Sequence, residues 1–196
     1  MFFPKFAELI IYHFMNNLYF IAIIPGDEVC KEATALKNFM AETYFSKAAL
    51  SSPPHITLYP PFRKDSSVEK LLDNSLTAFV QDKQKFEFSL NGFGCFKPSV
   101  IFIKPEPSES LNILQSKLLS HLKSTINLED AQNNRPFHPQ MTISTRDLKK
   151  NFFHSAWDEF REKEFKRLFE VRSIYLLKHN GKFWEILKEY SLQGIN

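Results

Sequence analysis

The sequence has no long apolar run, and this absence argues against a membrane protein. Among its 196 residues, no uninterrupted apolar stretch reaches the roughly 18 residues that a membrane span requires. The first 25 residues are rich in apolar side chains, but polar residues such as Lys5 and Glu8 interrupt them. They also lack the basic, apolar, small-residue order of a signal peptide. We therefore expect a soluble, cytoplasmic protein.

Cysteine and excess charge are also scarce. The two cysteines, Cys30 and Cys95, fit no metal-ligand or redox spacing and are typical of small buried side chains in a reducing compartment. No other residues show the spacing of a metal site, so we expect neither a metal nor another cofactor. The 25 Lys and Arg residues against 22 Asp and Glu leave a net charge of +3. This excess suits a phosphate or a short RNA, but not a surface that wraps a nucleic-acid duplex.

Apolar residues, in contrast, are plentiful. Hydrophobic residues make up 43% of the chain and aromatic residues 15%, enough to bury a large core. Met15 comes just before the first convincing strand, so we expect residues 1–14 to be an N-terminal extension, not necessarily native. We expect residues 15–196 to form a single domain.

Hydrophobic periodicity predicts alternating strands and helices. The predicted strands are 18–24, 55–59, 86–90, 100–103, 138–144, 170–178 and 182–187. The predicted helices begin after Pro25-Gly26-Asp27, near 66, near Ser108 and near 148. Pro60-Pro61 is expected to end the second strand, and Asn91-Gly92 to form a turn. After the opening strand, the order helix, strand, helix, strand pair occurs twice, which indicates an internal duplication.

Two short segments repeat one pattern: His55-Ile56-Thr57-Leu58 and Gln140-Met141-Thr142-Ile143. Successive side chains of a strand point to opposite faces, so the first and third residues of each segment share a face. Two such strands facing each other across a pseudo-twofold axis would line one groove with an imidazole, an amide and two hydroxyls. The alternative is that both are ordinary half-buried strands that carry threonine, a common strand residue.

These segments resemble the 2H phosphoesterase superfamily, and within it the branch of 2'-5' RNA ligase-like and cyclic phosphodiesterase proteins. Four stretches support the resemblance: the first motif, the stretch 137–143 followed by Arg146-Asp147-Leu148, the strand 18–23, and 92–96. The resemblance covers nearly everything after Met15. It implies an α+β fold of two pseudo-symmetric lobes of antiparallel sheet with outer helices around a central cleft. Each lobe contributes one His-x-Thr or His-x-Ser motif.

The resemblance also implies a chemistry that needs no metal. Opening a 2',3'-cyclic phosphate requires one group that takes a proton and another that gives one, and two imidazoles can do both. His55 is the expected proton carrier of the first lobe. Thr57 and Thr142 would donate hydrogen bonds to the phosphoryl oxygens. The expected partner is an RNA end or a nucleotide with a cyclic or 2'-5' phosphate, bound by a monomer.

The second motif departs from the family pattern, because Gln140 stands where the pattern requires histidine. Glutamine can hydrogen-bond a phosphate or a base but carries no proton at physiological pH. His138 could substitute only if the strand slipped or bulged. Arg146 could supply positive charge to the phosphate or lie in solvent, and Phe62 could stack on a nucleobase or pack in the core.

Three hypotheses remain open at this point. The first is a working phosphoesterase or ligase, with full or reduced activity. The second is an inactive relative that binds a nucleotide or RNA in the same cleft through Gln140 and the two threonines. The third is an interaction module in which both motifs are structural.

Overall fold

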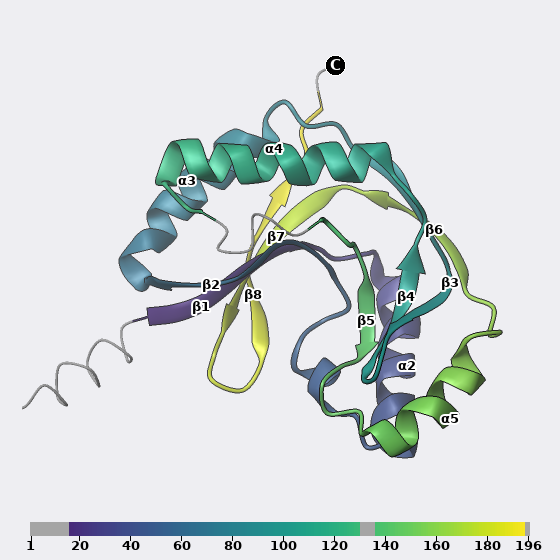
Figure 1. Cartoon of the computed structure of the whole chain (residues 1–196). Coiled ribbons are helices and arrows are strands. Elements are labelled where there is room, and N and C mark those ends of the chain that lie inside the picture. Colours follow the sequence, from purple (N-terminus) through teal and green to yellow (C-terminus); the bar gives the residue numbers. More distant parts are fainter. Residues whose placement is uncertain (1–15, 130–135, 195–196) are drawn as a thin grey trace, which may run out of the picture.

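The computed structural model describes residues 16–129 and 136–194, and the predicted extension of residues 1–14 lies outside them. The described residues form two antiparallel sheets of four strands each, with helices around them (Figure 1). The α+β fold of two antiparallel lobes that the sequence predicts is therefore confirmed.

The first sheet has the strand order β2-β1-β7-β8. Its strands are β1 (Asn16–Ile23), β2 (Ile56–Asp65), β7 (Ser173–His179) and β8 (Trp184–Ser191). Both faces of β1 are buried: Tyr19 and Ile21 point into the main core, whereas Phe20 and Ala22 belong to a smaller apolar cluster. The alternation follows from the two-residue period of a strand.

The second sheet has the order β5-β4-β3-β6. Its strands are β3 (Phe86–Phe96), β4 (Val100–Pro105), β5 (Met141–Ser144) and β6 (Lys166–Val171). In each sheet the motif strand, β2 or β5, lies at one edge and pairs with the strand that comes before it along the chain, β1 or β4. The predicted duplication is thus visible in the topology.

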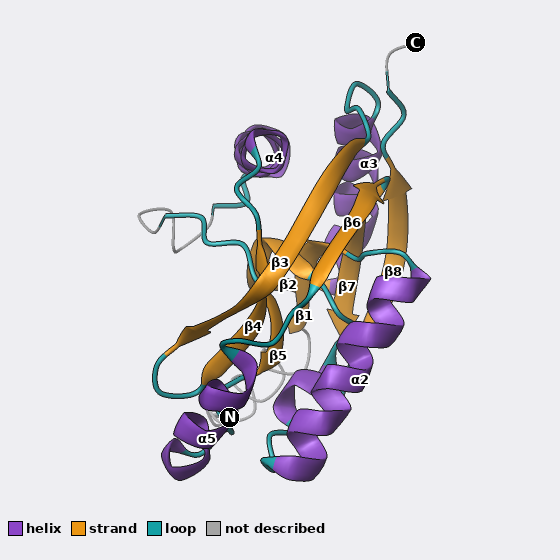
Figure 2. Ribbon diagram, turned by 90° about the vertical axis from the view of Figure 1, so that its right-hand side faces the viewer, coloured by secondary structure: helices purple, strands orange, loops and turns teal. Residues whose placement is uncertain are grey.

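The helices join the two lobes. They are α2 (Asp27–Thr43), α3 (Glu69–Val80), α4 (Glu109–Ile126) and α5 (Lys150–Phe160), with short 3-10 turns η1 (Ala48–Ser51) and η2 (Ser66–Val68). α2 follows a strand of the first sheet but contacts β5 of the second, and α4 follows a strand of the second sheet but contacts β2 of the first. Figures 1 and 2 both place α3 and α4 at one end of the molecule and α2 and α5 at the other.

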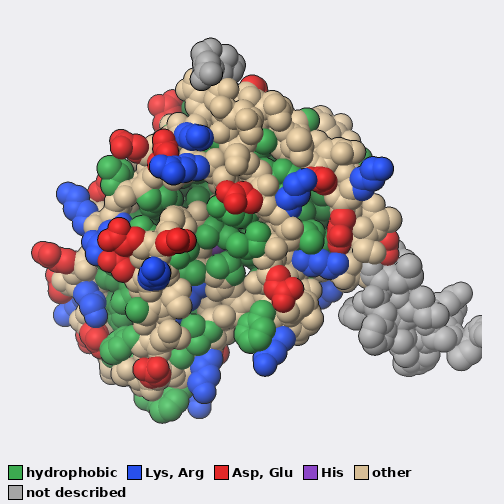
Figure 3. All heavy atoms as spheres, turned by 180° about the vertical axis from the view of Figure 1, so that it is seen from behind, with side chains coloured by type: hydrophobic (Ala, Val, Ile, Leu, Met, Phe, Trp, Pro, Cys, Tyr) green, Lys and Arg blue, Asp and Glu red, His purple; other side chains and the backbone are tan. Residues whose placement is uncertain are grey.

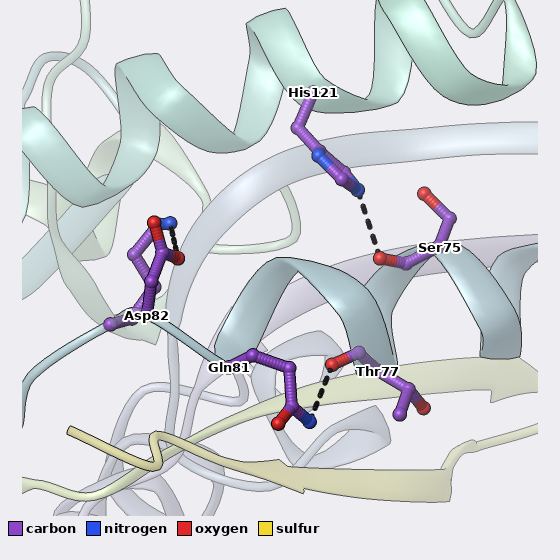
Figure 4. Close-up of polar contacts among 6 residues, drawn as sticks. Ser75, Thr77, Gln81, Asp82 and His121 are labelled. Atoms are coloured by element: carbon purple, nitrogen blue, oxygen red, sulfur yellow. Dashed lines mark hydrogen bonds and ion pairs between the residues drawn. The ribbon is translucent and has the colours of Figure 1, made fainter. Parts of the chain in front are cut away.

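α4 forms where the sequence predicts it. The Ser108 hydroxyl accepts a hydrogen bond from the Leu111 backbone N–H at 3.2 Å, which caps the first turn. Its buried stripe consists of Leu111, Leu114, Leu118 and Leu122, spaced three or four residues apart as in an amphipathic helix. His121 on the same helix lies 2.9 Å from the Ser75 carbonyl oxygen of α3 through its Nε2 (Figure 4), so this histidine connects two helices. Among the described residues, no helix combines the length and apolarity needed to cross a membrane.

Two turn predictions are wrong. Pro60-Pro61 does not end β2, which continues to Asp65. Its pairing with β1 shifts register beside the two prolines, and an edge strand with such a bulge tolerates residues that lack an N–H. Asn91-Gly92 is likewise no hairpin turn, because β3 runs on to Phe96. Gly92 has φ +68° at a register shift of the β3–β4 pair, a conformation that glycine adopts without strain.

Among the other strand boundaries that differ from the prediction, two affect how the sheets are built. The segment 170–178 is not one strand, because the chain passes from β6 in the second sheet to β7 in the first at Arg172. The second motif strand begins at Met141, three residues later than predicted. Periodicity does not mark either boundary, since each is set by which neighbouring strand offers a hydrogen-bond partner.

A pocket of about 600 Å³ lies between the two sheets. Tyr175 and Ile186 line it from the first sheet and Phe169 from the second, with Ile24 at the end of β1. Seen from behind, the molecule has hydrophobic side chains gathered at the centre of its face with charged side chains around them (Figure 3). The residues that line this pocket include none from either motif, so the pocket does not test the groove that the sequence predicts between the two motif strands.

Candidate functional site

The first motif lies at the start of β2. Ile56 and Leu58 are buried in the main core, while His55 and Thr57 are only half-buried. The predicted alternation of this motif is confirmed. Pro53-Pro54 comes just before it, and proline restricts the backbone of the residue that precedes it to extended conformations. The local sequence thus keeps the backbone extended just before His55, where β2 begins.

His55 has one ring nitrogen engaged. Its Nδ1 lies 2.7 Å from the Pro53 carbonyl oxygen. Because a carbonyl oxygen only accepts hydrogen bonds, Nδ1 carries the proton and Nε2 is left as the basic nitrogen. The ring also packs against Phe20, with ring centroids 4.8 Å apart. The imidazole is therefore held both in orientation and in tautomer.

The electrostatic setting keeps His55 neutral. Burial of the ring lowers the pKa of His55 from 6.5 to about 4, the Pro53 hydrogen bond opposes this effect, and the positive charge of Lys37 adds to it. A pKa of about 4 leaves the imidazole unprotonated at neutral pH. The side chain can accept a proton through Nε2 but has none to donate from that nitrogen.

The second motif has the same alternation. Met141 and Ile143 are fully buried, whereas Gln140 and Thr142 are half-buried. The Gln140 Nε2 donates a hydrogen bond to the Thr142 hydroxyl at 3.3 Å. The other end of the amide, Oε1, is buried and has no hydrogen-bond partner among the described residues. Such an atom costs free energy unless a ligand or water supplies a donor.

His138 does not belong to β5. It lies three residues before the first residue of the strand, in irregular backbone, and its side chain is exposed. The prediction that it shares a strand with Gln140 is therefore wrong. The pairing of β5 with β4 does shift register, between the pairs Ile101–Ser144 and Phe102–Thr142, but His138 stays outside the ladder.

Contacts between the lobes connect the two motif neighbourhoods. Asp147, which follows the second motif, accepts hydrogen bonds from the Ser46 hydroxyl at 2.8 Å and from the Lys47 and Ala48 backbone N–H groups at 2.6 and 2.7 Å. The helical turn η1, which leads into the first motif, also contacts β5. The carboxylate of Asp147, which follows the second motif, thus holds residues 46–48 of the segment that leads to His55.

Comparison with known proteins agrees with this architecture. A family model described as the 2'-5' RNA ligase superfamily matches residues 25–183. The chain belongs to the 2'-5' RNA ligase superfamily. The chain is 28% identical over 180 residues to a protein of Geobacillus sp. (strain WCH70) that is described as a candidate phosphoesterase. The match covers 90% of this chain and 96% of that protein.

Solved structures show that this superfamily member shares its fold with distant proteins. TT0787 of Thermus thermophilus superposes with a TM-score of 0.66 at 18% identity, over 92% of this chain and 100% of that one. E. coli LigT in complex with 3'-AMP gives a TM-score of 0.64 at 20% identity, over 90% and 98% of the two chains. At such low identity the likeness shows the fold alone.

The remaining predicted residues of this superfamily member have ordinary surroundings. Arg146 is exposed just beyond β5. Phe62 is half-buried between Tyr19 and Tyr59, with ring centroids 5.7 and 5.3 Å away, which fits the core role that the sequence also allowed. Within residues 16–129 and 136–194, no group of three or more His, Cys, Asp or Glu side chains is placed to hold a metal.

Sequence reasoning missed Lys37. The periodicity of α2 predicts Val29, Ala33, Leu36 and Met40 on the buried face, yet Lys37 is 2% exposed and Leu36 only partly buried. The signal that could have found it is its spacing, four residues after Ala33 and three before Met40, which places it on the same face of the helix.

Proposed function

We propose that this protein binds a nucleotide or an RNA end through a phosphate and opens 2',3'-cyclic phosphodiesters at a low rate, with His55 as the general base. The observation that carries the proposal is the asymmetry of the two motifs. His55 has a free basic nitrogen, whereas Gln140, beside Thr142, has no proton to give. The superfamily membership supports phosphoester chemistry, and LigT has been solved with 3'-AMP, NADP+, ATP and phosphate.

The reaction can be written from these side chains. The Nε2 of His55 takes a proton from water, the water oxygen bonds to phosphorus, and one ring P–O bond breaks. The products are a phosphate monoester and a free ribose hydroxyl. Thr57 and Thr142 donate hydrogen bonds to the non-bridging oxygens as their negative charge grows. The leaving oxygen takes its proton from solvent, because Gln140 replaces the second imidazole.

The expected rate loss is large. General acid or base catalysis typically contributes about a hundredfold to ten-thousandfold in rate, so a site with one proton carrier lacks about that factor. The variant Gln140→His should restore much of it. Gln84→His, which adds a histidine at an exposed position away from both motifs, is the matched control.

The test measures turnover and binding together. Hydrolysis of 2',3'-cyclic nucleotides is followed by chromatography for the native protein, Gln140→His, Gln84→His and His55→Ala, and calorimetry measures their binding of nucleoside monophosphates. We expect slow native turnover, a gain only in Gln140→His and loss in His55→Ala. Brisk native turnover that His138→Ala abolishes would contradict the proposal and assign the missing proton to His138.

One observation favours a second function, that of a nucleotide-binding protein without turnover. The unpartnered Oε1 of Gln140 can accept a hydrogen bond from a ribose hydroxyl or a base N–H, which is a binding role. Binding without turnover in both the native protein and Gln140→His would support this function. If the protein neither binds nor hydrolyses nucleotides, both functions are refuted and the third hypothesis, an interaction module, is favoured.

A further inference from the structure

Lys37 is a buried charged side chain that the reaction above does not use. It lies on the core-facing side of α2 with an exposed fraction of 2%. Lysine is almost never fully buried unless it is paired, and no ion pair to Lys37 is formed within the described residues. A methionine would fill similar space without the cost of desolvating an ammonium. Stability therefore does not account for a lysine at this position.

The contact of Lys37 points to His55. Its Nζ donates a hydrogen bond to the Ser52 carbonyl oxygen at 2.9 Å. The next carbonyl along the chain, that of Pro53, is the group that lies 2.7 Å from the His55 Nδ1. Two consecutive carbonyls of one short segment are therefore engaged, the first by a buried ammonium and the second by the imidazole.

We propose that Lys37 is a positioning residue for His55: its ammonium fixes the Ser52–Pro53 segment, so that the Pro53 carbonyl holds the imidazole with Nδ1 protonated and Nε2 free. The inference rests on the proposed role of His55 as the base. Asp147 fixes the beginning of the same connection through the Lys47 and Ala48 N–H groups. The segment that leads to His55 is thus held at its beginning by Asp147 and at its end by Lys37.

The charge of Lys37 also acts on His55 directly. It is the charged group that lowers the pKa of His55, in addition to burial. Burial in turn lowers the pKa of Lys37 to about 8, and the titratable group that acts on it is the thiol of Cys30, also on α2. Burial raises the pKa of Cys30, so the thiol stays protonated where Lys37 loses its proton.

The native protein provides the first test. Imidazole ¹⁵N chemical shifts of His55, assigned with His55→Gln, are followed by NMR from pH 4 to 10. We expect the Nδ1–H tautomer at neutral pH. We also expect a second change in the ring shifts with a midpoint near pH 8, where Lys37 becomes neutral. An Nε2–H tautomer of His55 in the native protein at neutral pH would overturn the inference without the need for any variant.

Variants provide the second test. Lys37→Met removes the ammonium, and Lys31→Met removes an exposed lysine from the same helix as the control. We expect Lys37→Met to populate the Nε2–H tautomer of His55 and to abolish the change near pH 8. In Lys31→Met both should match the native protein. If Lys37→Met also matches, the inference is wrong.

These measurements do not depend on turnover. A native protein that neither binds nucleotides nor hydrolyses cyclic phosphates, yet shows the expected response of His55 to Lys37, would refute the proposed function and support the positioning role. If instead Gln140→His is active while the ring shifts and tautomer of His55 do not change in Lys37→Met, the proposed function is supported and the positioning role is refuted.

Discussion

Replacement of Lys37 by methionine should stabilise the protein, although it removes a hydrogen bond. The side chain is 2% exposed, and burial lowers its pKa from 10.5 to about 8. At about 1.4 kcal/mol per pKa unit, the folded state loses about 3 kcal/mol by keeping this ammonium charged. The hydrogen bond to the Ser52 carbonyl stabilises the folded state by about 1 kcal/mol. Lys37→Met should therefore be more stable than the native protein by about 2 kcal/mol at pH 7.

The same numbers predict a pH dependence with a definite sign. The folded-state pKa of Lys37 is lower than the unfolded one, so between pH 8 and 10.5 the unfolded chain binds more protons than the folded chain. The free energy of unfolding of the native protein should rise over that window, while Lys37→Met lacks this rise. By pH 9.5 the advantage of the variant should have shrunk by about 2 kcal/mol, to nearly nothing.

Urea denaturation followed by circular dichroism measures both effects. Unfolding curves of the native protein, Lys37→Met and the control Lys31→Met are compared at intervals from pH 7 to 9.5. Higher pH is avoided, because burial raises the pKa of Tyr44 to about 12 and ionisation of the unfolded tyrosine near pH 10 would add a loss of stability. A methionine variant that is less stable than the native protein at pH 7, or that follows the same pH curve, would refute the reasoning.

Three more predictions concern packing, the connection between lobes and the base. Gly94→Ala should lose about 1–3 kcal/mol of stability in urea denaturation, because its Cβ would come within 2.5 Å of the facing phenylalanine ring; Gly26→Ala, with nothing within 4 Å, should change little. Asp147→Ala should lose about 1–3 kcal/mol, because it leaves two backbone N–H groups without their acceptor, and a loss no larger than that of the exposed Asp158→Ala would contradict the connection. For any measurable turnover, kcat/KM should stay level from neutral pH down to about 5 and fall as His55 gains its proton near pH 4; a fall centred near 6.5 would show that His55 is not held neutral.

A substantial part of this protein can be predicted from the sequence alone. Alternation of apolar residues fixes which side chains of the two motifs are buried, because a strand has a period of two whatever it pairs with. Ser108 and the leucines spaced three and four residues apart define α4, because capping and helical periodicity are local. The replacement of a motif histidine by Gln140 is also visible without any structure.

Only the tertiary structure decided the rest. Pro60-Pro61 and Asn91-Gly92 carry strong turn signals, yet both lie inside strands, because a partner strand absorbs them in a register shift. The burial of Lys37 and the tautomer of His55 depend on a carbonyl pair that other parts of the chain hold in place. Local patterns specify how a segment folds. Which partner each polar group contacts depends on the segments that pack against it, and a functional site consists of such contacts.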